Sequence, residues 1–140
     1  MYILDTNILS AMMRSPPVPE VAAWIDAQNE DSLFTTSISQ AEILSGLAIM
    51  SNGRRRRDLE TAARGMFADD FEDRVLPFDA EAAEAYAIIF AARRQTGRPA
   101  ATLDLMIASI AHAHDAGMVT RDTGGFEGCG LTLINPWTAA

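Results

Sequence analysis

The sequence predicts an α/β fold with a central, mostly parallel sheet of four or five short strands flanked by helices. Short apolar runs alternate with helical segments along the chain, a pattern typical of parallel strands connected by helices. The chain has 140 residues, about the length of one domain, and no repeat or linker divides it. We therefore expect a single domain over residues 1–140.

The strands are predicted from short apolar runs that end at polar or turn-forming residues. The first run, Tyr2–Leu4, ends at Asp5 and is typical of a buried strand with an acid at its carboxyl end. The other extended segments are Leu33–Thr36, Val75–Pro77, Met118–Thr120 and Leu131–Ile134.

Helices are predicted between these strands, over residues 7–13, 20–27, 54–71, 80–96 and 102–116. A further helix is expected to begin near Ser39, because Ser39 to Glu42 fits the capping-box pattern, and to end before Asn52-Gly53. In the helix over 102–116 we expect a buried stripe of Leu103, Ile107 and Ile110.

The charge distribution favours cation binding by carboxylates. The formal net charge is −8 and lysine is absent. Nine of the eleven arginines lie between Arg54 and Arg98 together with nine acids, so the remaining two arginines and ten acids account for the whole −8. The run Arg54–Arg57 is either a phosphate-contacting patch or a solvated helix face. An apolar run long enough to span a membrane is absent, and Asp5 interrupts any export signal, so we expect a cytoplasmic protein.

Four acids occupy positions that a parallel sheet brings together. Asp5 and Asp122 follow predicted strands, and Glu42 and Asp104 lie in the first turns of predicted helices. Strand ends and the starts of following helices share one edge of such a sheet. Converging carboxylates repel one another, and a hard divalent cation such as Mg²⁺ relieves that repulsion. The pattern therefore predicts a metal site that activates water or stabilises charge on a phosphodiester.

Each acid also has a purely structural interpretation. Asp5 is placed to cap a helix, Glu42 to complete the capping box, Asp104 to interact with a helix dipole and Asp122 to form a turn. The metal-site hypothesis depends on finding all four in this order.

Four segments in that order resemble the PIN domain, and most closely its VapC/FitB-like branch. They are Leu4–Asn7, Ser39–Glu42, Asp104–Ala108 and Thr120–Thr123, and the Asn135-Pro136-Trp137 segment is also similar to that branch. The resemblance covers essentially the whole chain.

The resemblance implies a Mg²⁺- or Mn²⁺-dependent endoribonuclease that is the toxin of a toxin–antitoxin pair. It assigns the acidic metal site to Asp5, Glu42, Asp104 and Asp122, and it places Thr6, Asn7, Thr120 and Thr123 as supporting polar residues. It also implies a homodimer, a cognate antitoxin, and contact with operator DNA only through the antitoxin complex. Next to the last acid, Arg121 is expected either to meet a substrate phosphate or to pair with a neighbouring acid.

Three other functions remain open from the sequence. A phosphatase or phospho-accepting receiver also uses a strand-end aspartate, but those families usually carry a lysine in the site, and this chain has none. A nuclease with the same chemistry that acts on DNA and a non-catalytic binding module with the same fold are the other two. The presence of all four acids argues against the last.

Overall fold

The computed structural model describes residues 1–139 and confirms the α/β fold. Five strands form one sheet in the order β3-β2-β1-β4-β5, and every neighbouring pair is parallel. The strands are β1 (Tyr2–Leu4), β2 (Leu33–Thr36), β3 (Val75–Leu76), β4 (Gly117–Val119) and β5 (Leu133–Ile134). Because all five run the same way, their carboxyl ends lie at one edge of the sheet.

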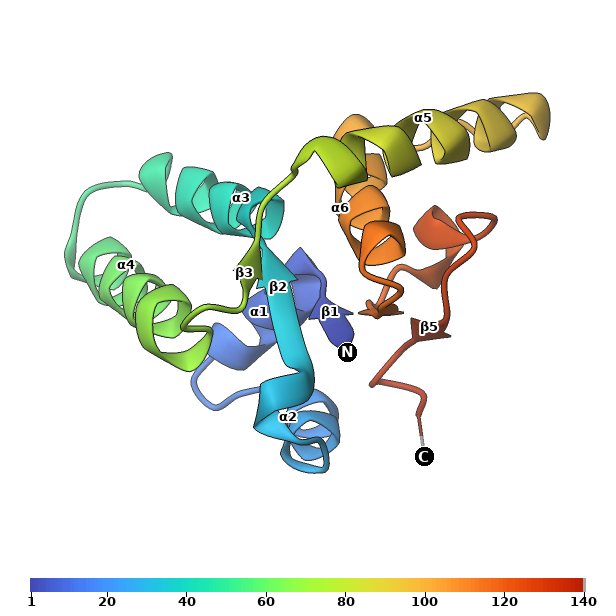
Figure 1. The fold of residues 1–140 in the computed structure, drawn as a ribbon. Coiled ribbons are helices and arrows are strands. Elements are labelled where there is room, and N and C mark those ends of the chain that lie inside the picture. Colours follow the sequence, from blue (N-terminus) through green and yellow to red (C-terminus); the bar gives the residue numbers. More distant parts are fainter. Residues whose placement is uncertain (140) are drawn as a thin grey trace.

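Helices connect the strands, as Figure 1 shows. The α-helices of residues 1–139 are α1 (Thr6–Met13), α2 (Pro19–Asp26), α3 (Ser37–Ala48), α4 (Arg54–Gly65), α5 (Ala80–Gln95) and α6 (Thr102–Ala113). Three short helical turns are η1 (Glu30–Ser32), η2 (Met66–Asp70, a π-helical turn) and η3 (Thr123–Phe126).

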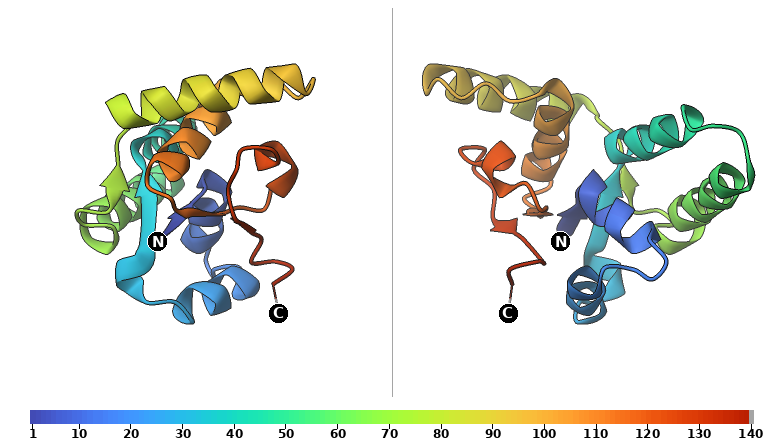
Figure 2. Two further views of the ribbon diagram at one scale, coloured as in Figure 1. Left: turned by 45° about the vertical axis from the view of Figure 1, so that its right-hand side comes forward. Right: turned by 180° about the vertical axis from the view of Figure 1, so that it is seen from behind.

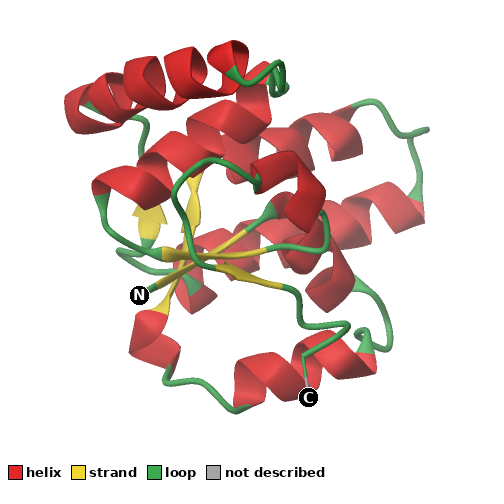
Figure 3. Cartoon of the chain, turned by 90° about the vertical axis from the view of Figure 1, so that its right-hand side faces the viewer, coloured by secondary structure: helices red, strands yellow, loops and turns green. Residues whose placement is uncertain are grey.

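The sheet separates two hydrophobic cores. Successive residues of β1 point to opposite faces, so Ile3 packs in one core and Leu4 in the other, and Met118 and Val119 of β4 divide in the same way. One core contains residues of α1, α2, α3 and α4, and the other contains residues of α5 and α6. Figure 3 shows the strands in the interior with helices around them.

The expected capping box at Ser39 and Glu42 is wrong. Helix α3 begins at Ser37, and its cap is Thr36, whose side-chain oxygen accepts a hydrogen bond from the amide of Ser39 at 3.1 Å. Thr36 is the last residue of β2 and keeps an extended backbone, which makes it a good N-cap. Because the helix starts two residues early, Glu42 lies in its second turn, free of any capping role.

Helix α6 also differs from the expectation. It ends at Ala113, and Asp115 takes a left-handed backbone conformation with φ of 51°. Gly117 is the first residue of β4 and pairs with Tyr2, where a Cβ atom would lie 3.1 Å from the tyrosine ring. Leu103 is 46% exposed, so its place in the buried stripe is wrong, and Leu105 is buried instead.

The ends of one further helix and of the last strand also differ from the expectation. The helix expected over residues 54–71 is α4 followed by the π-helical turn η2, and the last strand is limited to Leu133–Ile134.

Helix α5 packs along α6 at the outside of the molecule, away from α2 (Figure 2). Within residues 1–139, none of the helices is both long and apolar enough to cross a membrane.

Candidate active site

Asp5 lies at the carboxyl end of the central strand and is held by three hydrogen bonds. One carboxylate oxygen accepts from the amide of Thr6 at 2.8 Å, which makes Asp5 the N-cap of α1. The other oxygen accepts from the hydroxyl of Thr120 at 2.8 Å and from the side-chain amide of Asn7 at 3.4 Å. The capping interpretation is therefore right, but it uses only one of the two oxygens. Asp5 is only 5% exposed.

Thr120 links two of the acids. Its fully buried hydroxyl donates to Asp5 and accepts from the amide of Asp122 at 3.0 Å. The side-chain amide of Asn7 lies 3.3 Å from the same hydroxyl oxygen. Two of the residues expected to play a supporting role, Asn7 and Thr120, are thus in contact with Asp5.

Glu42 reaches the same region from α3. Its carboxylate accepts a hydrogen bond from the hydroxyl of Thr6 at 2.8 Å, and that hydroxyl also lies 3.0 Å from the side-chain oxygen of Ser39. Since Thr6 directly follows Asp5, this hydrogen bond ties α3 to the end of the central strand.

Asp104 lies in the first turn of α6, and Asp122 precedes η3. Asp122 accepts a hydrogen bond from the amide of Gly125 at 3.2 Å, so it has the turn-forming role that was its structural interpretation. Thr123 begins η3 and is not among the residues that line the pocket described next.

The structure brings all four acids to one pocket of about 550 Å³. The pocket is lined by Asp5, Thr6, Asn7, Ser10, Ala11, Arg14, Val18, Glu42, Asp104, Arg121, Asp122 and Trp137. The sequence interpretation missed Ser10 and Arg14. Ser10 follows Thr6 by four residues and so shares its face of α1, and Arg14 comes directly after the last residue of that helix. The spacing of Thr6 and Ser10 was the available signal.

Burial and mutual repulsion raise the pKa values of two of these carboxyls. Burial raises the pKa of Asp5 from 3.8 to about 6, although hydrogen bonds from Thr120 and Thr6 oppose the rise and the charges of Asp104 and Glu42 add to it. The pKa of Asp104 is raised first by burial and then by the charges of Glu42 and Asp122. Each of the four carboxylates therefore takes part in this repulsion.

The donor set fits a hard divalent cation. All four acids offer oxygen ligands, and a cation relieves their repulsion. Within residues 1–139, no three acid, histidine or cysteine side chains lie close enough together to form a complete metal-binding group. Mg²⁺ is commonly bound by one or two carboxylates and keeps several water ligands. Carboxylates spaced as these are therefore better suited to a partly hydrated Mg²⁺ than to a cation whose ligands all come from the protein. The metal-binding role of the four acids stays a prediction.

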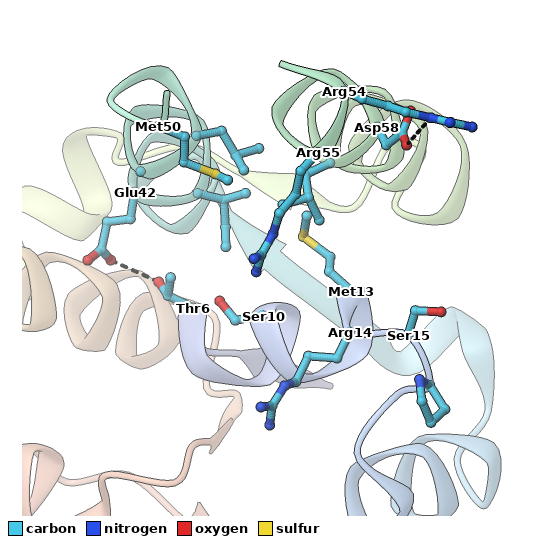
Figure 4. A pocket seen from close by; sticks show the side chains of 15 residues that line it. Thr6, Ser10, Met13, Arg14, Ser15, Glu42, Met50, Arg54, Arg55 and Asp58 are labelled. Carbon is cyan, nitrogen blue, oxygen red and sulfur yellow. Dashed lines mark hydrogen bonds and ion pairs between the residues drawn. The ribbon is translucent and has the colours of Figure 1, made fainter. Parts of the chain in front are cut away.

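A second, larger pocket adjoins the acidic one. It has a volume of about 1030 Å³ and lies between α1, α3 and α4, and the two pockets share Thr6, Ser10, Arg14 and Glu42. Figure 4 shows Arg55 extending from α4 toward α1, while Arg54 lies beside Asp58. Arg56 pairs with Glu60 at 2.7 Å. Two of the four consecutive arginines are thus paired along their own helix.

The fold and the family model agree on the class of protein. The model of the PIN domain matches residues 2–128, and the chain belongs to the PIN domain family. Two relatives are similar to the chain over nearly its whole length. VapC ribonuclease Y4jK of Sinorhizobium fredii is 40% identical over 140 residues, which is 100% of both chains. Toxin FitB of Neisseria gonorrhoeae is 34% identical over 137 residues, or 98% of this chain and 99% of FitB.

Solved structures agree with this assignment. The crystal structure of FitAcB from Neisseria gonorrhoeae matches with a TM-score of 0.92 and 33% identity, covering 99% of this chain and 100% of that one. The structure of FitAB bound to the IR36 DNA fragment matches with a TM-score of 0.93 and 33% identity, covering 100% of this chain and 98% of that one. The expected resemblance to the VapC/FitB-like branch is confirmed.

Proposed function

We propose that this protein is a Mg²⁺- or Mn²⁺-dependent endoribonuclease and the toxin of a toxin–antitoxin pair. The observation that carries the proposal is the meeting of Asp5, Glu42, Asp104 and Asp122 at one pocket beyond the carboxyl edge of the sheet. The names of the relatives, a VapC ribonuclease and toxin FitB, support the activity and the biological role.

The four acids are proposed as the metal ligands and catalytic residues. When bound there, a divalent cation would supply Lewis-acid activation of water and positive charge for a phosphodiester substrate. Thr120 and Asn7 fix the orientation of Asp5, and Thr6 fixes that of Glu42. These contacts hold the carboxylates in place before substrate arrives, so little reorganisation is needed during the reaction.

Arg121 is proposed to bind a phosphate of the substrate. It lines the acidic pocket, and within residues 1–139 its guanidinium makes no ion pair with an acid. The other outcome expected from the sequence, pairing with a neighbouring acid, is therefore absent from the described part of the chain.

The proposed partners follow from the relatives. A cognate antitoxin is proposed because neighbours such as FitAB are described as complexes bound to DNA. Operator DNA is proposed to bind through the antitoxin, because the neighbour described as bound to a DNA fragment is FitAB rather than FitB alone. We also propose a homodimer and a cytoplasmic location, where an RNA-cutting toxin meets its substrate.

The test is cleavage of a mixed RNA pool by the purified protein with Mg²⁺, with Mn²⁺ and with EDTA. Asp5→Asn is expected to reduce cleavage by roughly 100-fold or more, because an amide keeps the shape of the carboxylate but not its charge. The matched control is Glu84→Gln on the exposed surface of α5, which is expected to cleave like the wild type.

Matched DNA and RNA pools distinguish the remaining candidates. Metal-dependent cutting of RNA with little cutting of DNA of the same sequence supports the proposal. Preferential cutting of DNA overturns the substrate assignment, and undiminished cutting by Asp5→Asn overturns the site assignment.

A further inference from the structure

Arg121 and Trp137 form a stacked pair at the rim of the acidic pocket. The guanidinium carbon of Arg121 lies 4.8 Å from the centroid of the Trp137 ring, and both side chains line the pocket. The residue next to Arg121 in the sequence is Asp122, and three further acids line the same pocket. In the part of the chain described here, Arg121 nevertheless forms an ion pair with none of them.

The hydrogen-bonding edge of Arg121 is available. A guanidinium group carries its five N–H donors in one plane. Within residues 1–139, the hydrogen bonds of Arg121 involve its backbone and not its guanidinium. The edge can therefore still form two parallel hydrogen bonds to a phosphate. An arginine that instead paired with Asp5 or Asp104 would lose this edge and would neutralise the carboxylates of the site.

Backbone and amide contacts fix the stack relative to Asp5. The side chain of Asn135 accepts from the amide of Trp137 at 2.9 Å and donates to the carbonyl of Arg121 at 3.4 Å. The amide of Arg121 donates to the side-chain oxygen of Asn7 at 3.2 Å, and Asn7 itself contacts Asp5. One continuous set of contacts thus runs from the C-terminal segment to the central carboxylate.

We propose that Trp137 is a positioning residue for Arg121, holding its guanidinium off the carboxylates with the edge open to a phosphate of a nucleic-acid strand. The inference rests on the proposed nuclease function. It gives the Asn135-Pro136-Trp137 segment a role in substrate binding, in addition to the packing of Trp137 against the core.

The experiment is a double-mutant cycle on binding of a short, labelled, mixed-sequence single-stranded RNA, measured by fluorescence anisotropy in the presence of Mg²⁺. All proteins carry Asp5→Asn so that the probe stays intact. Arg121→Ala is expected to weaken binding about tenfold, the loss of one charge-assisted contact. Trp137→Leu is expected to weaken it roughly threefold to tenfold, and the double variant no further than Arg121→Ala alone, because both changes remove the same contact.

Three further variants separate positioning from packing. Trp24 also packs against this core, at 5.3 Å from the Tyr2 ring, but it is not among the residues that line the acidic pocket. Trp24→Leu should therefore leave RNA affinity unchanged. Trp137→Phe keeps a weaker aromatic face and should bind between wild type and Trp137→Leu. Arg121→Lys keeps the charge without the planar edge and should bind less well than arginine.

The outcomes separate this inference from the function on which it rests. Additive losses in the double variant, or an equal loss in Trp24→Leu, overturn the positioning role even when the wild type cleaves RNA. The same double-mutant cycle is repeated with DNA of matched sequence. If the losses of Arg121→Ala and Trp137→Leu are non-additive for DNA but RNA is not the substrate, the positioning role holds and the assignment of RNA fails. If neither RNA nor DNA binds to the Asp5→Asn protein and the wild type cleaves neither, both the inference and the function fail.

Discussion

At the scale of single residues, Asp5 is where structural and chemical roles coincide. One oxygen caps α1, and the other is held by Thr120 and Asn7. Burial of the carboxylate works against the fold, because the charged form loses its hydration. Its pKa of about 6 is a direct result of that burial.

The stability of the metal-free protein should depend on the ionisation of Asp5. The folded protein binds the proton more tightly than the unfolded chain, since burial raises the pKa from 3.8 to about 6. The contribution of Asp5 to the free energy of unfolding is therefore fully present below about pH 4 and is lost as the pH rises through about 6, by roughly 2 to 3 kcal/mol. Urea unfolding in EDTA should show this fall in the wild type.

Asp5→Asn should show a smaller fall across the same pH range, because it removes the titrating group. Asp104 also has a raised pKa, but it is present in both proteins, and its shift comes from burial, Glu42 and Asp122. The difference between the two proteins therefore isolates Asp5. Identical pH dependence in the two would contradict the buried, charged state described for Asp5.

At the scale of elements, the capping of α3 decides where Glu42 points. Thr36 ends β2 and caps α3, so the helix leaves the sheet directly at its carboxyl edge. Thr36 is buried, and its hydroxyl oxygen accepts a hydrogen bond from the amide of Ser39. Glu42, six residues after the cap, then accepts a hydrogen bond from Thr6, the first residue of α1.

Thr36→Val should destabilise the protein by about 1 to 2 kcal/mol, because it keeps the shape of the side chain but leaves the amide of Ser39 unpaired. Ser39→Ala is the matched comparison, since a capping box would make Ser39 the important residue. Thermal unfolding should show the larger loss for Thr36→Val. A larger loss for Ser39→Ala would restore the capping-box interpretation.

The sequence predicts the elements better than their ends. The apolar run before Asp5 and the alternation of strands and helices were sufficient to predict the parallel sheet. The start of α3 was missed because Ser39 and Glu42 fit a local capping pattern. The residue that caps the helix is Thr36, the last residue of the preceding strand β2. Leu103 was misplaced because periodicity alone does not say which face of α6 meets the sheet and α5. The stack of Arg121 on Trp137 joins distant residues, and local pattern carries no signal for it.

At the scale of the whole molecule, the arginines of the middle region mostly serve the fold. Arg56 pairs with Glu60, Arg74 donates to the carbonyls of Glu30 and Leu33, and Arg93 is buried against the carbonyls of Arg98 and Glu127. These contacts use the positive charge locally, and within residues 1–139 the four acids of the pocket form no ion pair with an arginine.

A divalent cation should therefore stabilise the protein more than a monovalent salt at equal ionic strength. With Mg²⁺ at about ten times its dissociation constant, the expected gain is about 1.4 kcal/mol, or roughly 3–6 °C in Tm for a domain of this size. Differential scanning fluorimetry with MgCl₂ and NaCl measures the difference.

Asp104→Asn should reduce this magnesium-specific gain, while Glu84→Gln, an exposed acid of α5 outside the pocket, should keep it. The result does not depend on finding the correct RNA. An equal response to both salts, or an equal loss in both variants, would place cation binding elsewhere than at the four carboxylates.

The hydrogen bond from Thr120 to Asp5 joins residues 115 positions apart in the chain. During translation Asp5 is made 115 residues before Thr120. A nascent chain that has not yet reached Asp104 carries Asp5 without Thr120, which orients it, and without two of the other carboxylates. If the protein cuts RNA as proposed, such a chain should not yet cleave, because the acidic site is complete only once Asp122 has been made.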